Sequence, residues 1–174
     1  MNVELYIFNA LHSLVGRFGA LDWLVVFTGK YLPYLAAAVV VWLVFQEKNW
    51  RDRIYYGSFL VLAAILSRAL ITEIIRLFYF RSRPFAEIGF EPLISHAATA
   101  GFPSGHAALY FALAFALFFF SRTWGSVFTA LALAVGAARV IAGVHWPLDI
   151  AAGILVALIS VFVVKWLLAP SGRG

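Results

Sequence analysis

The sequence predicts an all-α fold, an integral membrane helical bundle with an amphipathic helix at its N-terminus. Of the 174 residues, 64% are hydrophobic and 12% are charged, whereas soluble domains are about half apolar and about a quarter charged. Several apolar runs reach about 20 residues, the length at which a helix crosses the hydrocarbon core of a bilayer. No polar stretch is long enough to separate two domains, so we expect residues 1–174 to form one membrane domain with about five to six transmembrane helices.

The N-terminal segment, residues 3–17, has apolar side chains near one helical face. Leu5, Phe8, Leu11 and Val15 recur at roughly helical spacing. The run is short and polar for a membrane span, which favours an amphipathic helix at the membrane interface. A tilted span is the alternative. The segment lacks a basic region followed by a cleavage site, so it does not resemble a signal peptide.

Five apolar runs follow and predict the membrane spans. They cover residues 21–45, 54–80, 106–120, 126–142 and 148–168. Pro33 predicts a kink in the first span, because proline lacks a backbone donor and neighbouring helices can accommodate the bend. A charged loop at 46–53 and a tight polar turn at 121–126 are the expected connections at one end of the bundle.

Basic residues are spread along the chain and give a net charge of +5. They form no contiguous basic face, so we expect no nucleic-acid partner. Lys and Arg prefer short cytoplasmic loops, and a cytoplasmic 46–53 loop gives that side Lys48, Arg51, Arg53, Arg122, Lys165 and Arg173. The outer side then carries Arg17, Lys30, Arg81, Arg83 and Arg139. The chain has no Cys, which excludes disulfides and thiolate metal sites.

Three polar clusters stand at the ends of apolar runs, and the middle one reads Pro103-Ser104-Gly105-His106. Ser104 is a typical helix N-cap, and Gly105 allows close approach of the backbone to a ligand. Amide groups at a helix N-terminus bind phosphate, and His106 in the first turn has the pKa range for proton transfer. The alternative is a simple helix cap beside a surface His.

The last cluster contains Arg139, His145 and Asp149. Gly143 and Pro147 predict that one helix ends and the next begins between them. Asp149 follows His145 by four residues, so the two side chains can face each other. A carboxylate that accepts one imidazole N–H leaves the other ring nitrogen free to attack an electrophile. Alternatively, Asp149 only complements the helix dipole.

The first cluster contains Arg76 and Arg83. Seven residues return to nearly the same helical face, and Pro84 is expected to end the helix. Two guanidinium groups on one face could line a phosphate pocket, since their donors match phosphate oxygens. Arg83 could instead snorkel to the membrane boundary, and Arg68 and Glu73 are expected to be structural partners.

In order and spacing, the three clusters resemble the signature of the type 2 phosphatidic acid phosphatase (PAP2) superfamily: Lys-x6-Arg-Pro, Pro-Ser-Gly-His and Ser-Arg-x5-His-x3-Asp. The resemblance implies that His145 is the nucleophile that forms a phosphohistidine, that Asp149 orients it, and that His106 protonates the leaving oxygen. It also implies ligands for the phosphoryl oxygens at Arg76, Arg83, Ser104, Gly105 and Arg139. Such enzymes are expected to need no metal ion and no other cofactor.

Two positions depart from that signature. Arg76 stands where the family has Lys, which keeps the charge and changes the geometry. Ala138 stands where the family has Ser, which removes one potential hydrogen bond to phosphate. Neither change touches the expected nucleophile or acid, so we expect activity to be retained.

The substrate hypothesis comes from a more local resemblance. Residues 85–102 leave no room for a headgroup-selecting domain, and the stretch from Leu93 to Phe102 looks like the bacitracin-resistance type of undecaprenyl-diphosphate phosphatase. Such an enzyme acts at the outer face of the bacterial plasma membrane, and Arg81 could meet the second phosphate. His96 could assist the headgroup or be a bystander. The lipid tail is expected between helices, near aromatic residues such as Phe78, Tyr79 and Phe80.

Other functions remain open at this stage. The same motifs fit a phosphatase of phosphatidylglycerophosphate, phosphatidic acid or the lipid A 1-phosphate. A small transporter would use buried Arg, Glu and His as an ion path, but it predicts charges spread through the membrane depth. A vanadate-dependent haloperoxidase shares the pocket signature, although a short membrane chain is an unexpected host for it.

Overall fold

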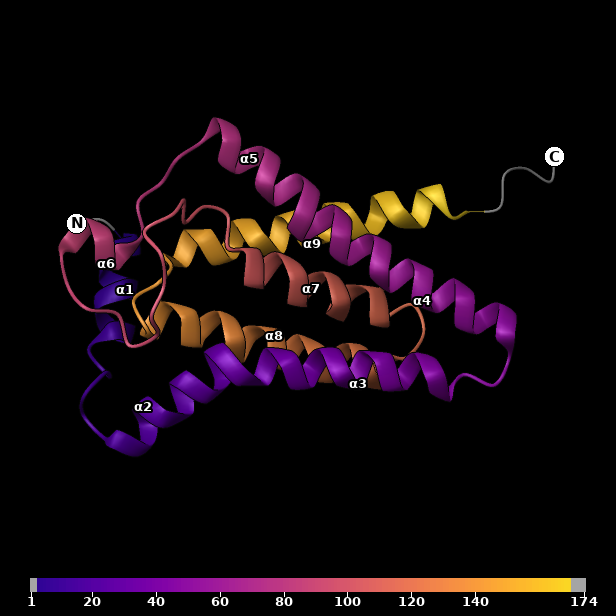
Figure 1. The fold of residues 1–174 in the computed structure, drawn as a ribbon, viewed down its shortest axis with the longest axis horizontal. Coiled ribbons are helices and arrows are strands. Elements are labelled where there is room, and N and C mark those ends of the chain that lie inside the picture. Colours follow the sequence, from indigo (N-terminus) through magenta and orange to yellow (C-terminus); the bar gives the residue numbers. More distant parts are fainter. Residues whose placement is uncertain (1–2, 170–174) are drawn as a thin grey trace.

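The computed structural model describes residues 3–169 as an all-helical bundle (Figure 1), which confirms the predicted fold class. Residues 3–169 contain no strand. Arg173, which was counted for the orientation, lies outside the described residues. The helices are α1 (Val3–His12), α2 (Gly19–Val26), α3 (Leu32–Gln46), α4 (Trp50–Ala64), α5 (Thr72–Phe78), α6 (Pro84–Ile88), α7 (Gly105–Leu117), α8 (Arg122–Ile141) and α9 (Pro147–Leu167), with two π-helical turns, η1 (Phe27–Tyr31) and η2 (Ile65–Ile71).

Four continuous helical segments are long and apolar enough to cross a membrane: Gly19–Gln46, Trp50–Phe78, Arg122–Ile141 and Pro147–Leu167. They correspond to four of the five predicted spans. The expected turn at 121–126 is wrong, because α8 already begins at Arg122. The Ser121 hydroxyl accepts a hydrogen bond from the Trp124 amide at 3.3 Å and caps that helix, so the connection lies before Ser121.

The fifth predicted span is α7, which lies among the longer helices (Figure 1). It has 13 residues, and ten of them are buried. Ala107, Ala108, Ala112, Ala114 and Ala116 lie on it, and small side chains allow close helix packing in membranes. Its short length is explained by this central position, since the surrounding helices cover it from lipid.

The first and second spans each contain a π-helical turn, η1 and η2 respectively. The first span bends where α2 meets α3 (Figure 1), directly before Pro33 in the first turn of α3. Proline cannot donate to the carbonyl four residues earlier, which belongs to Gly29. The kink predicted from Pro33 is therefore confirmed, and η1 is the local form it takes.

The N-terminal helix α1 lies at one end of the bundle next to α6 (Figure 1). Its 10 residues are about 15 Å long, which is half the hydrocarbon thickness, so α1 does not span. Phe8 is buried and packs with Val140 and Trp146. Leu5 is exposed and Val15 follows the helix, so the apolar face is narrower than its spacing predicts.

Candidate active site

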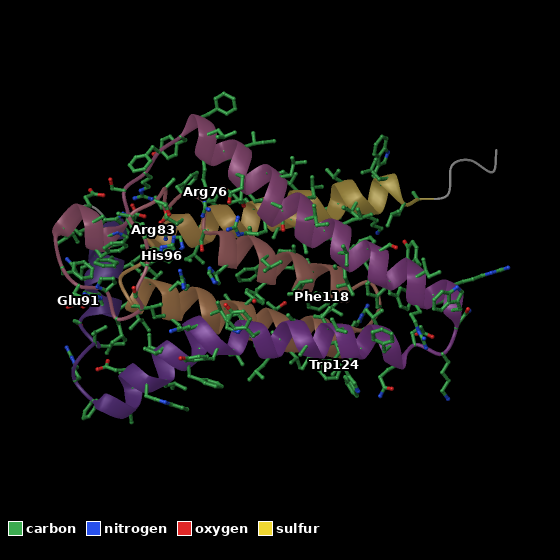
Figure 2. The ribbon with its side chains drawn as sticks, viewed as in Figure 1. Arg76, Arg83, Glu91, His96, Phe118 and Trp124 are labelled. Carbon is green, nitrogen blue, oxygen red and sulfur yellow. The ribbon has the colours of Figure 1, made fainter. Side chains whose placement is uncertain are left out.

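The three polar clusters come together at the end of the bundle that also holds α1 and α6. Figure 2 shows Arg76, Arg83 and His96 gathered there, whereas Phe118 and Trp124 lie near the opposite end. The site is built from the 79–104 loop, the start of α7 and the connection between α8 and α9. Hydrogen bonds join the three clusters: Arg83 contacts His145, Arg76 donates to the Pro103 carbonyl, and the Ser104 amide donates to the Asp149 carbonyl.

His145 lies on a sharp connection between α8 and α9. Gly143 has φ +79°, a left-handed conformation that suits glycine and ends α8, and Pro147 starts α9. The His145 Nδ1 atom is 3.3 Å from Asp149 Oδ2, and both side chains are buried. The same oxygen accepts the Trp146 amide at 2.9 Å. Asp149 therefore caps α9 and also faces His145, as their spacing predicts, while its role in orienting a nucleophile stays a prediction.

Arg83 is buried on the other side of His145. Its Nη1 donates to His145 Nε2 at 3.1 Å and to the Val144 carbonyl at 2.9 Å. Nε and Nη2 donate to the carbonyls of Thr99 and Ala100 at 3.0 and 3.1 Å. Four of the five guanidinium N–H groups are thus used. With 2% exposure, Arg83 does not snorkel, and it ties the 99–100 loop to His145.

The expected helical relation between Arg76 and Arg83 is wrong. The second span ends at Phe78, residues 79–83 are not helical, and Pro84 starts α6 instead of ending the preceding helix. Pro84 occupies the first turn of α6, where a missing N–H costs no hydrogen bond. Arg83 is the N-cap residue of α6. It reaches the site from the non-helical segment between α5 and α6, and not by sharing a helical face with Arg76.

The contacts of His145 define the state of its imidazole ring. Arginine only donates, so Nε2 accepts, and the ring proton lies on Nδ1 facing Asp149. Burial, followed by the positive charges of Arg83 and Arg139, lowers the pKa of His145 well below its usual value. His145 is accordingly a neutral imidazole whose lone pair lies on Nε2.

Arg81 lies behind this pair and is held by two carboxylates. Its Nη1 donates to Asp149 Oδ1 at 3.1 Å, and its Nη2 donates to Glu4 Oε2 at 2.6 Å. Burial lowers the pKa of Arg81, but the Glu4 hydrogen bond and the Asp149 charge outweigh it and raise the pKa. The suggested contact of Arg81 with a second phosphate stays a prediction, since both terminal nitrogens already have partners.

Sequence reasoning missed Glu4. This carboxylate on α1 accepts from Arg81 through Oε2 and from the Leu148 amide, in the first turn of α9, through Oε1 at 3.0 Å. The only signal in the sequence was an acidic residue in an apolar N-terminal segment, which predicts no particular partner.

The start of α7 is bonded to the first turn of α9. Ser104 caps α7 by accepting the Ala107 amide at 3.4 Å, as predicted, and the Ser104 amide donates to the Asp149 carbonyl at 2.9 Å. Gly153 makes this contact possible, because an added Cβ would lie 2.8 Å from the Ser104 carbonyl. His106 is half-buried and lines a cavity, so the alternative of a cap beside a surface His is wrong.

Arg76 and Arg139 bring donors without partners to the site. Arg139 is 3% exposed, and its Nε and Nη2 have no hydrogen-bond partner within residues 3–169. Arg76 donates to Glu73 and to the Pro103 carbonyl, while its buried Nε is likewise unpaired. Buried unpaired donors are costly, and an anion with several acceptor oxygens would satisfy them. The donors fit a phosphoryl group.

Further side chains complete this end of the molecule. The His96 ring is 6.5 Å from that of His145, and burial lowers the pKa of His96.

The expected ion pair between Arg68 and Glu73 is confirmed. Lys30, which received no role from the sequence, lines the same cavity as Arg68 and His106. The described part of the chain holds no group of three or more His, Cys, Asp or Glu arranged to bind a metal ion.

The fold is an all-helical membrane bundle. At one end it holds a neutral imidazole and unpaired arginine donors, and these two features together define the class of protein. Residues 57–173 match the PAP2 superfamily, and the chain belongs to that superfamily of membrane phosphatases. This confirms the resemblance seen in its motifs.

Two curated relatives are similar to most of the chain, and one solved structure has the same fold. Undecaprenyl-diphosphatase BcrC of Bacillus subtilis is 34% identical over 164 residues, which are 93% of this chain and 81% of that protein. Bacitracin transport permease protein BcrC of Bacillus licheniformis is 34% identical over 162 residues, 91% of this chain and 77% of that protein. The crystal structure of Aquifex aeolicus LpxE superposes with a TM-score of 0.77 at 23% identity, covering 95% and 96% of the two chains, and supports the fold.

Proposed function

We propose that this protein removes the terminal phosphate of undecaprenyl diphosphate through a phosphohistidine intermediate and thereby recycles the lipid carrier of cell-wall precursors. One observation carries the proposal: neutral His145 is held between Asp149 and Arg83 with its lone pair on Nε2, and the nearby clusters supply the buried, unpaired donors of Arg76 and Arg139. The substrate is supported by the two BcrC relatives, of which one is a diphosphatase by name.

In the first step, His145 Nε2 attacks the terminal phosphorus and the bond to the bridging oxygen breaks. The Nη1–H of Arg83 that now donates to Nε2 donates its hydrogen bond to a phosphoryl oxygen instead, and the guanidinium keeps its proton. Asp149 stabilises the positive ring through Nδ1–H. Arg76, Arg139 and the backbone at Ser104–Gly105 stabilise the charge on the transferred group, which is the main task in phosphoryl transfer.

His106 completes both half-reactions. It donates a proton to the bridging oxygen, which leaves as undecaprenyl phosphate. The neutral His106 then takes a proton from a water molecule, whose oxygen attacks the phosphohistidine. Inorganic phosphate leaves, and His145 regains its lone pair. The sum is hydrolysis of one phosphoanhydride bond, with both histidines restored.

The test is phosphate release by the purified protein in detergent with EDTA, for undecaprenyl diphosphate, phosphatidylglycerophosphate, phosphatidic acid and lipid A in parallel. We expect turnover that EDTA leaves unchanged and a preference for the polyprenyl diphosphate. His145→Ala should lose turnover while its thermal unfolding stays close to that of wild type. Near-normal rates in this variant would refute the nucleophile assignment.

A different lipid phosphate is the second candidate substrate, because the motifs hold the phosphoryl group and not the rest of the lipid. A preference for a glycerophospholipid or lipid A in the same assay would keep the chemistry and change the biological role. A transporter is disfavoured, since Arg76 and Arg83 of the motif clusters lie together with His96 at one end of the bundle (Figure 2).

The site is proposed to face the periplasmic or extracellular side of a bacterial plasma membrane. Positively charged Lys48, Arg51, Arg53 and Arg122 lie on or beside the α3–α4 and α7–α8 connections, at the end opposite the site (Figure 1). Lys and Arg favour cytoplasmic loops, so the site end is the outer one.

A further inference from the structure

A basic cavity adjoins the proposed reaction site on the side of His106. It has a volume of about 290 Å³ and lies between the first span, η2 and the start of α7. Its polar lining includes Lys30, Arg68, His106, Tyr34 and Tyr110. His106 lines the cavity, and His145 does not. The Tyr110 ring stacks with the His106 ring at 6.4 Å, one helical turn along α7, and fixes its orientation.

Both basic residues of this cavity lie on π-helical turns. Lys30 is in η1 and Arg68 is in η2, in segments otherwise long and apolar enough to span a membrane. π-Helical turns are rare, and they are found frequently at functional sites. Basic side chains inside spans are costly and usually functional. Two such residues facing one cavity point to an anionic ligand.

The position of Arg68 depends on a glycine of the Pro-Ser-Gly-His cluster. A Cβ at Gly105 would lie 2.5 Å from Arg68 Nε, so the guanidinium rests directly on the start of α7. Arg68 also pairs with Glu73, whose Oε1 accepts from Arg76 at 3.0 Å. Arg68 is therefore oriented and connected to the proposed phosphoryl site.

Lys30 has no such partner. Within residues 3–169 its ammonium group makes no ion pair, and its only described interaction is with the Tyr31 ring at 5.3 Å from the centroid. Across the whole site, the basic groups of Lys30, Arg68, Arg76, Arg81, Arg83 and Arg139 outnumber the carboxylates of Glu4, Glu73 and Asp149. This excess suits a diphosphate better than a single phosphate ester.

We propose that Lys30 and Arg68 bind the phosphate that remains on the lipid, and so select a diphosphate substrate. The attacking and leaving atoms lie roughly in line across the transferred phosphorus. His145 attacks from one side, and His106 protonates the bridging oxygen on the other. The group beyond that oxygen is the second phosphate of the lipid, which falls in the cavity lined by Lys30, Arg68 and His106. This inference rests on the proposed function.

The test compares farnesyl diphosphate with farnesyl phosphate, which share a tail and differ by one phosphate. For Lys30→Gln we expect kcat/KM on the diphosphate to fall about 10-fold or more, as for a lost charged hydrogen bond, and kcat/KM on the monophosphate to stay within about 3-fold. Lys48→Gln, at the opposite end, is the matched control and should leave both values unchanged. Arg68→Lys keeps the charge beside Glu73 and should lose less than Arg68→Gln.

Inhibition supplies a second readout on any lipid that wild type hydrolyses. Methylenediphosphonate can fill both phosphate positions, and inorganic phosphate fills one. The inhibition constant of the diphosphonate should rise in Lys30→Gln while that of phosphate does not. An equal loss on both substrates, or no loss on the diphosphate, overturns the proposed subsite.

Failure of the function and failure of the subsite are distinguishable. If wild type released no phosphate from any lipid, the proposed function would fall. Calorimetric binding of methylenediphosphonate would then decide the subsite: weaker binding by Lys30→Gln than by wild type supports it, and equal binding or no binding by wild type overturns it.

Discussion

The imidazole of His145 has its reactive state set by two neighbours. Asp149 accepts a hydrogen bond from Nδ1–H, and Arg83 donates to Nε2. Arg83 has a double effect, because its hydrogen bond defines the tautomer while its charge opposes protonation. In the proposed role of nucleophile, a neutral ring with its lone pair on Nε2 needs no separate base to activate it.

The ionisation state of His145 can be observed directly. With ¹⁵N-labelled histidine in detergent, and with His145→Gln to assign the signal, NMR should show a neutral ring protonated on Nδ1. Because its pKa is lowered, the ring should remain neutral as pH falls through about 6.5, where an ordinary His becomes protonated. A ring that titrates at or above this pH, or one protonated on Nε2, would contradict the geometry.

At the scale of elements, α1 and the 79–83 segment support the first turn of α9. Glu4 accepts from Arg81 and from the Leu148 amide, and Arg81 in turn donates to Asp149. The indole ring of Trp146 lies under the Arg81 guanidinium, 5.5 Å from it. Helix α1 thus connects through two ion pairs, both made by Arg81, to the carboxylate that faces His145.

This connection predicts a positioning role for Glu4. In Glu4→Gln, Arg81 loses a charged partner, and we expect kcat to fall about 10-fold while KM changes little, because neither residue holds the phosphoryl group. Ser13→Ala, an exposed change on the same segment, is the control.

A double-mutant cycle tests whether the two residues act as one unit. Glu4→Gln combined with Arg81→Gln should be no worse than the more damaging single change. Fully additive losses in kcat, or a change confined to KM, would refute the proposed connection from Glu4 through Arg81 to Asp149.

The packing of α7 on α9 makes a prediction about stability. At Gly153, an added Cβ would lie 2.7 Å from Ala107 Cβ and 2.8 Å from the Ser104 carbonyl. Gly153→Ala should therefore lower the free energy of unfolding by about 1–3 kcal/mol and displace the start of α7. Gly19→Ala, where the added methyl group meets no atom within 4 Å, is the matched control. Equal thermal unfolding of the two variants in detergent would show that the contact can relax.

The whole molecule separates two ends with different tasks. One end gathers the site, α1 and α6, and the other carries the connections at Lys48 and Ser121 (Figure 1). The exposed aromatic residue Phe78 ends the second span and exposed Phe80 follows it, beside the site end, where a lipid tail could reach them. This separation explains how a hydrophobic lipid can present a charged headgroup to the pocket.

The orientation can be tested with single cysteines, because the chain has none of its own. Ser95→Cys lies on the exposed loop at the site end, and Lys48→Cys lies on the opposite connection. A membrane-impermeant maleimide should label Ser95→Cys in intact cells, and should label Lys48→Cys only after the cells are opened. The reverse pattern would place the site on the cytoplasmic side.

Much of the fold and part of the site could be predicted from the sequence, through short-range features. Apolar runs gave the spans, Ser104 and Pro147 marked helix starts, and Gly143 marked a helix end. The four-residue spacing of His145 and Asp149 predicted their contact. The assumption of an unbroken helix up to Pro84 failed, because hydropathy does not show that backbone leaves the helix at Phe78.

The sequence by itself determined which segments are helices and which residue types stand at their ends, because hydropathy, capping and close spacing act within a few residues. Tertiary structure alone decided the partners of those residues. Glu4 and Arg81 are 77 positions apart, Arg81 and Asp149 are 68 apart, and Lys30 meets His106 only across a cavity between helices. No local pattern encodes such pairs, since they arise when packed helices bring buried charges within hydrogen-bond distance.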